Sequence, residues 1–102
     1  MTPSEILLKA ADLIEQKGWT QGAYARSGEF EVSSLHREAT CYCTIGAIIC
    51  ATGEARMLGR GVVDGTKARL FAMIGDHDIV SWNDTPGRTK EEVVEALRRA
   101  AQ

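Results

Sequence analysis

Two helix-start signatures, one near each end of the chain, constrain the fold more than any other feature. Thr2-Pro3-Ser4-Glu5 and Thr89-Lys90-Glu91-Glu92 both have the pattern of a capping box, in which a threonine and a glutamate three residues later satisfy each other's backbone N–H groups. Behind each box, apolar residues recur at helical spacing: the first set is Ile6, Leu7, Ala10, Ala11 and Ile14, and the second is Val93, Val94, Leu97, Ala100 and Ala101. The sequence therefore predicts a helix that starts at Pro3 and is ended by Gly18, and a last helix that starts after Thr89.

The segment from Cys41 to Ala51 is almost entirely apolar or small. Its β-branched residues would suit a strand, but its small residues recur four apart, which favours a tightly packed helix. We predict a buried central helix over Cys41–Ala51, ended by Gly53. One more turn is predicted over Glu54–Leu58, before a break at Gly59-Arg60-Gly61.

A third helical pattern follows that break. It starts at Asp64 or Thr66, runs to Ile74 and is ended by Gly75. The residues expected to face inward are Leu70, Phe71, Met73 and Ile74. The next apolar residues, Ile79, Val80 and Trp82, are predicted to be extended.

The stretch between Gly18 and Thr40 has no helical period. Phe30 and Val32 alternate with acidic and small polar residues, which is typical of a short strand or hairpin. A loop draped over the core is the alternative, and the pattern does not decide between them. The predicted fold is thus mainly α: one compact single domain over residues 1–102, with about four helices and an irregular or short-hairpin segment after the first helix.

Composition excludes several functional classes. The net charge is −2 and the pI is about 5.6, so the basic surface of a nucleic-acid-binding protein is not expected. The longest apolar run is shorter than the about 20 residues that span a bilayer, so no membrane association is expected. The start of the chain has no basic and apolar targeting pattern, and three cysteines form no regular disulfide framework. We expect a cytoplasmic protein with reduced thiols.

The segment Trp82–Thr89 holds the densest group of polar and turn-forming residues. Pro86-Gly87 fits the centre of a type II turn, Thr89 caps the last helix, and Trp82 is expected to anchor the segment as a largely buried ring. We favour this structural interpretation. The functional interpretation is a binding surface formed by Asn83, Asp84 and Arg88 beside a helix N-terminus. Nearby acidic residues make a phosphate ligand there less favourable.

Cys43 is the candidate nucleophile. In chain order it is followed by His77 and then by Asn83 or Asp84, which is the order of a Cys-His-Asn/Asp hydrolase, and a helix N-terminus would lower the thiol pKa. Burial in an apolar run would instead raise the thiol pKa. We favour Cys43 as a small core residue and assign no catalytic residue.

The sequence holds no regular metal-binding pattern. The residues that together could supply zinc ligands are Cys41, Cys43, Cys50, His36 and His77. Their spacing is Cys-x-Cys instead of Cys-x-x-Cys, and a second pair is missing. The run Asp76–Asp78 lacks the longer ligand loop of an EF-hand. We expect neither a metal ligand nor a cofactor.

Three motifs resemble a known family. They are Gly18-Trp19-Thr20-Gln21-Gly22, Cys43-Thr44-Ile45-Gly46-Ala47 and Trp82-Asn83-Asp84-Thr85-Pro86-Gly87-Arg88-Thr89. In this order and spacing they are similar to a family of short proteins from actinobacteria and their phages, described as a domain of unknown function. The resemblance implies a small, mainly helical domain without an assigned activity, and it supplies no catalytic residue.

Two functional hypotheses remain. The favoured one is a small non-enzymatic protein-interaction or regulatory domain, host-encoded or phage-borne, that binds a protein partner or a second copy of itself. Its support includes the aromatic residues Tyr24, Phe30 and Tyr42, which the pattern places at the surface. The alternative is a small ligand-binding protein or Cys-dependent enzyme, with a pocket between the central helix and the Trp82–Arg88 segment.

Overall fold

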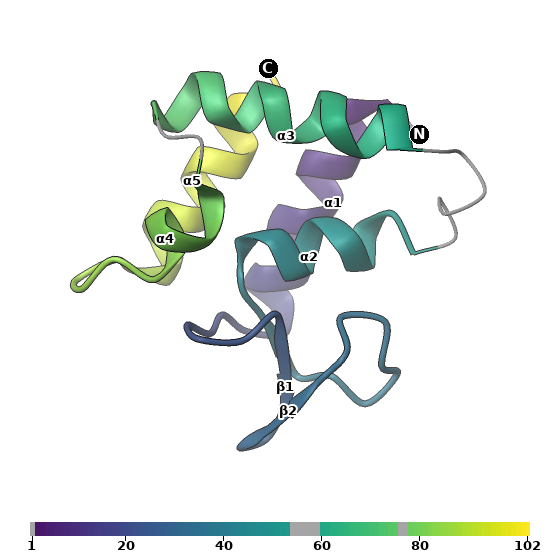
Figure 1. Cartoon of the computed structure of the whole chain (residues 1–102), viewed down its shortest axis with the longest axis vertical. Coiled ribbons are helices and arrows are strands. Elements are labelled where there is room, and N and C mark those ends of the chain that lie inside the picture. The colour runs from purple at the N-terminus through teal and green to yellow at the C-terminus, as the bar shows by residue number, and fades with distance from the viewer. Residues whose placement is uncertain (1, 54–59, 76–77) are drawn as a thin grey trace.

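The first helix, α1 (Pro3–Gln16), forms the centre of the core. Figure 1 shows the computed structural model, which describes residues 2–53, 60–75 and 78–102. The predicted capping box is present, because Glu5 N donates to Thr2 Oγ1 at 3.2 Å and Thr2 N donates to Glu5 Oε1 at 3.0 Å. The predicted apolar face is fully buried, and Gly18 with φ +146° follows the end of the helix. The prediction for this helix is confirmed.

The last helix, α5 (Lys90–Ala100), is also confirmed. Thr89 and Glu92 form the second capping box, and the apolar face packs against α1. Arg98 near the end of α5 forms ion pairs with Asp12 and Glu15 of α1. Apolar packing and ion pairs therefore both hold α5 against α1.

The central helix is shorter than predicted. α2 is Thr44–Ala51, and the two residues predicted as its start, Cys41–Tyr42, form a strand, β3. Cys43 has extended dihedral angles, φ −79° and ψ 177°, and serves as the N-cap. The prediction of helix from Cys41 was wrong, because the backbone of these residues pairs with a neighbouring strand instead of continuing the helix.

That neighbouring strand belongs to a hairpin. β1 (Ala25–Ser27) and β2 (Phe30–Val32) are antiparallel, and the sheet order is β2-β1-β3. Gly28, with φ +61°, occupies the tight connection between β1 and β2. Of the two alternatives left open by the sequence, the hairpin is therefore the one observed. Figure 1 shows this hairpin projecting away from the helices.

α3 (Arg60–Ile74) starts earlier than predicted and ends before Gly75, whose φ is +71°. Its buried stripe contains Thr66 and Leu70, four residues apart. Met73 was predicted to face inward, but it is exposed because it lies at the edge of this stripe. The predicted turn over Glu54–Leu58 lies outside the described residues.

The segment predicted as extended before Trp82 is a short helix, α4 (Ile79–Asn83). Asp78 caps it, since Ser81 N donates to Asp78 Oδ1 at 3.0 Å, and Ile79 is buried. The extended prediction was wrong because an aspartate N-cap favours a helical turn here. The described residues therefore form five helices and a small sheet in one compact, mainly α domain, which confirms the predicted fold class. Within those residues, no helix is long and apolar enough to cross a membrane.

Candidate functional site

The three sequence motifs meet at one buried side chain, that of Asn83. Its Oδ1 accepts hydrogen bonds from Trp19 Nε1 (2.7 Å), Thr44 N (2.9 Å) and Thr44 Oγ1 (2.7 Å). Its Nδ2 donates to Thr20 O at 3.1 Å and to Asp84 Oδ1 at 2.9 Å. Asn83 is fully buried, so these bonds replace water on both ends of the amide. Trp19 and Thr20 come from the loop after α1, and Thr44 is the first residue of α2.

A second set of bonds ties the same loop to the end of α4. Gln21 Nε2 donates to the carbonyl oxygens of Asn83 (3.0 Å) and Thr85 (3.2 Å), and Gly22 N donates to Asp84 Oδ1 at 3.1 Å. We call this set the Asn83 network; its members are Trp19, Thr20, Gln21, Gly22, Thr44, Asn83, Asp84 and Thr85. The network fixes the position of the loop that leads into β1.

Next to the network, the backbone of the loop before β1 packs closely against the start of α2. Tyr24 O accepts from Cys43 N at 3.1 Å, and a Cβ added at Gly46 would lie 1.8 Å from Tyr24 O. Only glycine at this position lets α2 approach the loop so closely. The glycine of the second motif therefore has a specific structural task.

The predicted turn and cap before α5 are present. Arg88 N donates to Thr85 O at 3.0 Å, and Gly87 has φ +87°, as a type II turn with Pro86 before it requires. Trp82 is partly buried and packs against the core, which agrees with its predicted role as an anchor. One face of its ring is covered by the Arg88 guanidinium, 4.3 Å from the centroid.

The three predicted binding residues have different surroundings. Asn83 is fully buried and does not present its amide at the surface. Asp84 is half-buried beside the loop after α1. Arg88 lies over Trp82, and its Nε donates to Trp82 O at 3.0 Å. The sequence did not indicate that Trp19, Gln21 and Thr44 contact these residues, although the same motifs contain them.

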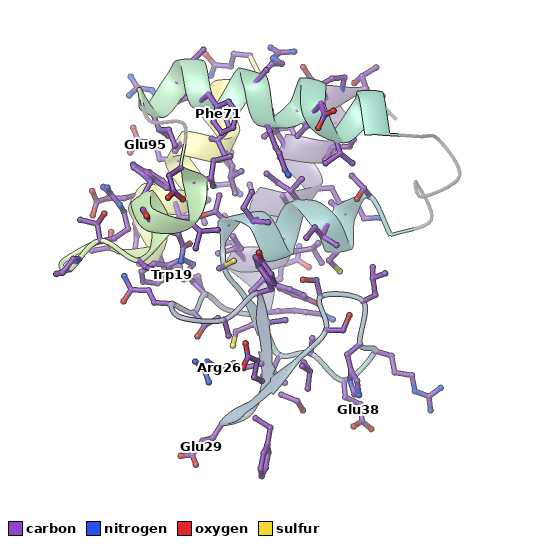
Figure 2. All side chains as sticks on the ribbon, in the orientation of Figure 1. Trp19, Arg26, Glu29, Glu38, Phe71 and Glu95 are labelled. Carbon is purple, nitrogen blue, oxygen red and sulfur yellow. The ribbon has the colours of Figure 1, made fainter. Side chains whose placement is uncertain are left out.

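Two shallow hollows lie beside the Asn83 network. The first, of about 150 Å³, lies between the start of α2, the hairpin and α4, and is lined by Gly22, Ala23, Tyr24, Glu31, Cys43, Val80 and Asp84. The second, of about 190 Å³, shares Tyr24 and Val80 and is completed by Ile45, Lys67, Phe71, Asp78 and Ile79. Figure 2 marks Phe71 on α3 and Trp19 in the loop after α1. We call the two hollows together the Tyr24 face.

The central side chains of this face are apolar and exposed. Tyr24 is 51% exposed and Val80 is 39% exposed, although each has one buried core residue next to it in the chain, Ala25 and Ile79 respectively. Charged residues lie around them: Glu31 and Asp84 at one hollow, Lys67 and Asp78 at the other. An apolar centre with a charged edge is the usual arrangement of a protein-binding surface.

Cys43 serves as a helix cap in this structure. Its Sγ accepts from Gly46 N at 3.3 Å, and the residue is buried. Burial raises the pKa of the Cys43 thiol, and hydrogen bonds from Gly46 and Ile45 only partly oppose this. The thiol is therefore neutral near pH 7, which does not favour a nucleophile. His77, the histidine of the hydrolase order, lies outside the described residues.

The other candidate ligands are scattered. His36 is exposed, and its Nδ1 accepts from Glu38 N at 3.1 Å, while Cys50 Sγ lies 3.6 Å from Tyr42 Oη. In the part of the chain that the structure describes, no three His, Cys, Asp or Glu side chains are grouped to hold a metal ion. Asp76 and His77 are outside that part. Tyr42, expected at the surface, is 1% exposed, so that prediction was wrong.

Fold and site together define a small, mainly helical domain with a buried polar network beneath a shallow, partly apolar face. The model of a family of unknown function (DUF6197) matches residues 1–102, and the chain belongs to this family. No curated protein and no solved structure matches the chain.

Proposed function

We propose that this protein is a non-enzymatic protein-interaction domain that binds its partner on the Tyr24 face. The observation that carries this proposal is the pair of exposed apolar side chains, Tyr24 and Val80, between two adjacent hollows. Aromatic residues flanked by hollows are the usual anchors of protein interfaces. Phe30 at the hairpin is more exposed still, but it lines neither hollow.

The size of the hollows favours a protein over a small molecule. Pockets for small ligands commonly enclose about 300–1,000 Å³, whereas these hollows measure about 150 and 190 Å³. Each is large enough for one or two side chains. The raised pKa of Cys43 also disfavours the alternative hypothesis of a Cys-dependent enzyme in the first hollow.

The three predicted binding residues keep a role in this proposal, but in two different ways. Asp84 lines the first hollow and contacts the partner directly. Asn83 and Arg88 are positioning residues: Asn83 holds the loop after α1, and Arg88 holds the turn against α4. Their effect on binding therefore passes through the shape of the face.

We also propose the class of partner and the cellular location. The acidic composition and the acidic residues of the first hollow favour a protein partner over a nucleic acid. The resemblance to a family of actinobacteria and their phages supports a regulatory factor, host-encoded or phage-borne, that acts in the cytoplasm.

A capture experiment with matched variants tests the face. Tagged parent protein, Tyr24→Ser and Val80→Ser are incubated with lysate of an actinobacterial host, beside Leu8→Ser as the control. Leu8 is 47% exposed but lies on α1 and lines neither hollow. We expect at least one protein that the parent and Leu8→Ser recover and that both face variants lose. Equal recovery of every protein by all four would contradict the proposal.

A further inference from the structure

We propose that the first hollow of the Tyr24 face takes the cationic side chain of a partner segment, an arginine or lysine next to an apolar residue. This inference rests on the proposed function and names the chemistry of the partner. Among the described residues, the seven that line the hollow include two carboxylates, Glu31 and Asp84, and no basic residue. These lining residues thus carry negative charge and no positive charge.

The two carboxylates are available for an incoming cation. Asp84 Oδ1 accepts from Gly22 N and Asn83 Nδ2, whereas Oδ2 has no partner among the described residues. Glu31 is exposed on β2 and forms no ion pair within those residues. A guanidinium or ammonium group between them would gain charge-assisted hydrogen bonds.

Arg26, a basic residue on the same sheet, forms hydrogen bonds with other groups and no ion pair with Glu31. Arg26 on β1 lies opposite Glu31 in the strand register. Its Nε donates to Thr20 Oγ1 at 3.1 Å, and its other nitrogens donate to the carbonyl oxygens of Glu29 and Gln21 at 3.4 Å each. Arg26 therefore supports the loop after α1, and Glu31 has no ion-pair partner among the described residues.

The remaining walls suit the stem of a long basic side chain. Tyr24 offers a half-exposed ring, and Val80 and Ala23 offer aliphatic surface. Guanidinium groups stack on aromatic rings, and the methylene groups of Arg and Lys cover apolar surface while the charge stays near water. The neutral thiol of Cys43 adds no competing charge.

The second hollow supplies the place for the apolar neighbour. Ile45 and Ile79 are almost fully buried and line it together with the partly buried Phe71. Its charged residues, Lys67 and Asp78, have opposite signs, so this hollow does not select for a cation. Because the hollows share Tyr24 and Val80, adjacent residues of one partner segment can fill both.

An NMR titration of the whole protein with a small probe tests this inference. The probe is the acetyl-leucyl-arginine methylamide, and its matched control is the citrulline analogue, which has the same shape but no charge. We expect the arginine probe to shift the amide signals of Gly22, Tyr24 and Asp84, and to bind about five-fold more tightly than the citrulline probe. About 0.5 M salt should remove most of this difference. Equal binding of both probes, or no shift of these signals, overturns the inference.

Variants can separate the effect of removing a charge from the effect of disturbing the fold. Glu31→Gln leaves the Asn83 network untouched, because Glu31 forms none of its hydrogen bonds, and it should weaken the arginine probe about three-fold or more. Asp84→Asn should act in the same direction. Glu95→Gln, at an exposed site on α5, is the control and should leave the affinity unchanged. Equal affinities of Glu31→Gln and Glu95→Gln overturn the inference.

The outcome also distinguishes this inference from the proposed function. If Tyr24→Ser no longer captures a protein that Glu31→Gln still captures in low salt, the face binds this partner without recognising a positive charge on it. If the amide signals of the face shift with protein concentration alone, the occupant is a second copy of the chain. Either result overturns the cationic site and leaves the protein-interaction domain standing.

Discussion

Asn83 is the single residue on which the arrangement of the site depends most. Replacement by alanine would leave the Trp19 indole N–H, the Thr44 N–H and the Thr20 carbonyl without this partner. Each buried polar group left unpaired costs about 1–3 kcal/mol. We predict that Asn83→Ala lowers the free energy of unfolding by about 3–4 kcal/mol, measured by urea denaturation. Gln21→Ala, at an exposed position, should lower it by less than about 1.5 kcal/mol; equal losses would contradict the central role of Asn83.

A pair of glycines gives a second prediction at the same scale. A Cβ at Gly46 would meet Tyr24 O at 1.8 Å, whereas a Cβ at Gly65 would meet only Pro3 Cγ, at 3.7 Å. Alanine favours a helix over glycine by about 1 kcal/mol. We therefore predict that Gly65→Ala raises the melting temperature and that Gly46→Ala lowers it or prevents folding. A stabilising Gly46→Ala would show that the loop does not lie against α2.

Cys43 should be the least reactive thiol of the native protein. It is 3% exposed and burial raises its thiol pKa, whereas Cys41 and Cys50 are half-buried. We predict that an alkylating reagent at about pH 7.5 modifies Cys41 or Cys50 before Cys43. Peptide mapping by mass spectrometry after short exposures measures the order. Preferential modification of Cys43 would contradict this prediction and support Cys43 as a reactive nucleophile.

The sequence identified important residues of the site but not how they are used. Asn83 and Asp84 stand out beside a turn, and short polar residues there commonly bond to nearby backbone. The actual partners of Asn83 are 64 residues away at Trp19 and 39 residues away at Thr44. Local patterns carry no information about such contacts, so a buried network was interpreted as a polar surface.

At the scale of elements, the sequence predicted well wherever a helix carries its own start signal and a regular apolar stripe. α1 and α5 have a threonine cap, a glutamate three residues later and a regular apolar stripe. β3 was missed because Cys41–Tyr42 pairs with β1, which is distant in the sequence, whereas α4 was missed although its own start signal, the Asp78 cap, lies next to it. Short apolar runs suit a helix or a strand about equally until a partner is known.

The cap of α5 can be tested directly. Thr89 Oγ1 accepts from Glu92 N at 3.2 Å, and Thr89 N donates to Glu92 Oε1 at 3.0 Å. We predict that Thr89→Ala lowers the free energy of unfolding by about 1 kcal/mol, measured by chemical denaturation. Thr89→Ser keeps the hydroxyl and should lose less than half of that. Equal stability of Thr89→Ala and the parent would show that the cap does not stabilise the helix.

Both capping boxes should also make stability depend on pH. Hydrogen bonds from Thr89 hold the pKa of Glu92 below its ordinary value of 4.5, and hydrogen bonds from Thr2 do the same for Glu5. Each lowered pKa adds stability that is present above pH 4.5 and is lost as the pH falls through the folded-state pKa. Melting temperatures across this range should fall less for Glu92→Gln than for the parent. Parallel curves would contradict this contribution.

At the scale of the whole molecule, three distant segments form one face because the core brings their ends together. α1 packs against α2, α3 and α5, and the loop after α1 lies beside the start of α2 and the end of α4 (Figure 1). The exposed residues Tyr24 and Val80 lie where these segments meet. The Tyr24 face is therefore a property of the assembled domain, and no single element carries it.

Hydrogen exchange measured by NMR shows whether these three segments open together or separately. The N–H groups to compare are the Trp19 indole, the Thr44 amide and the Cys43 amide, which donate to Asn83 Oδ1 or to Tyr24 O. If the three motifs form one cooperative unit, all three groups should exchange with the same free energy of opening, close to that of global unfolding. A Trp19 indole that exchanges much faster than the Thr44 amide would contradict the claim, because the loop would then open while α2 stays folded.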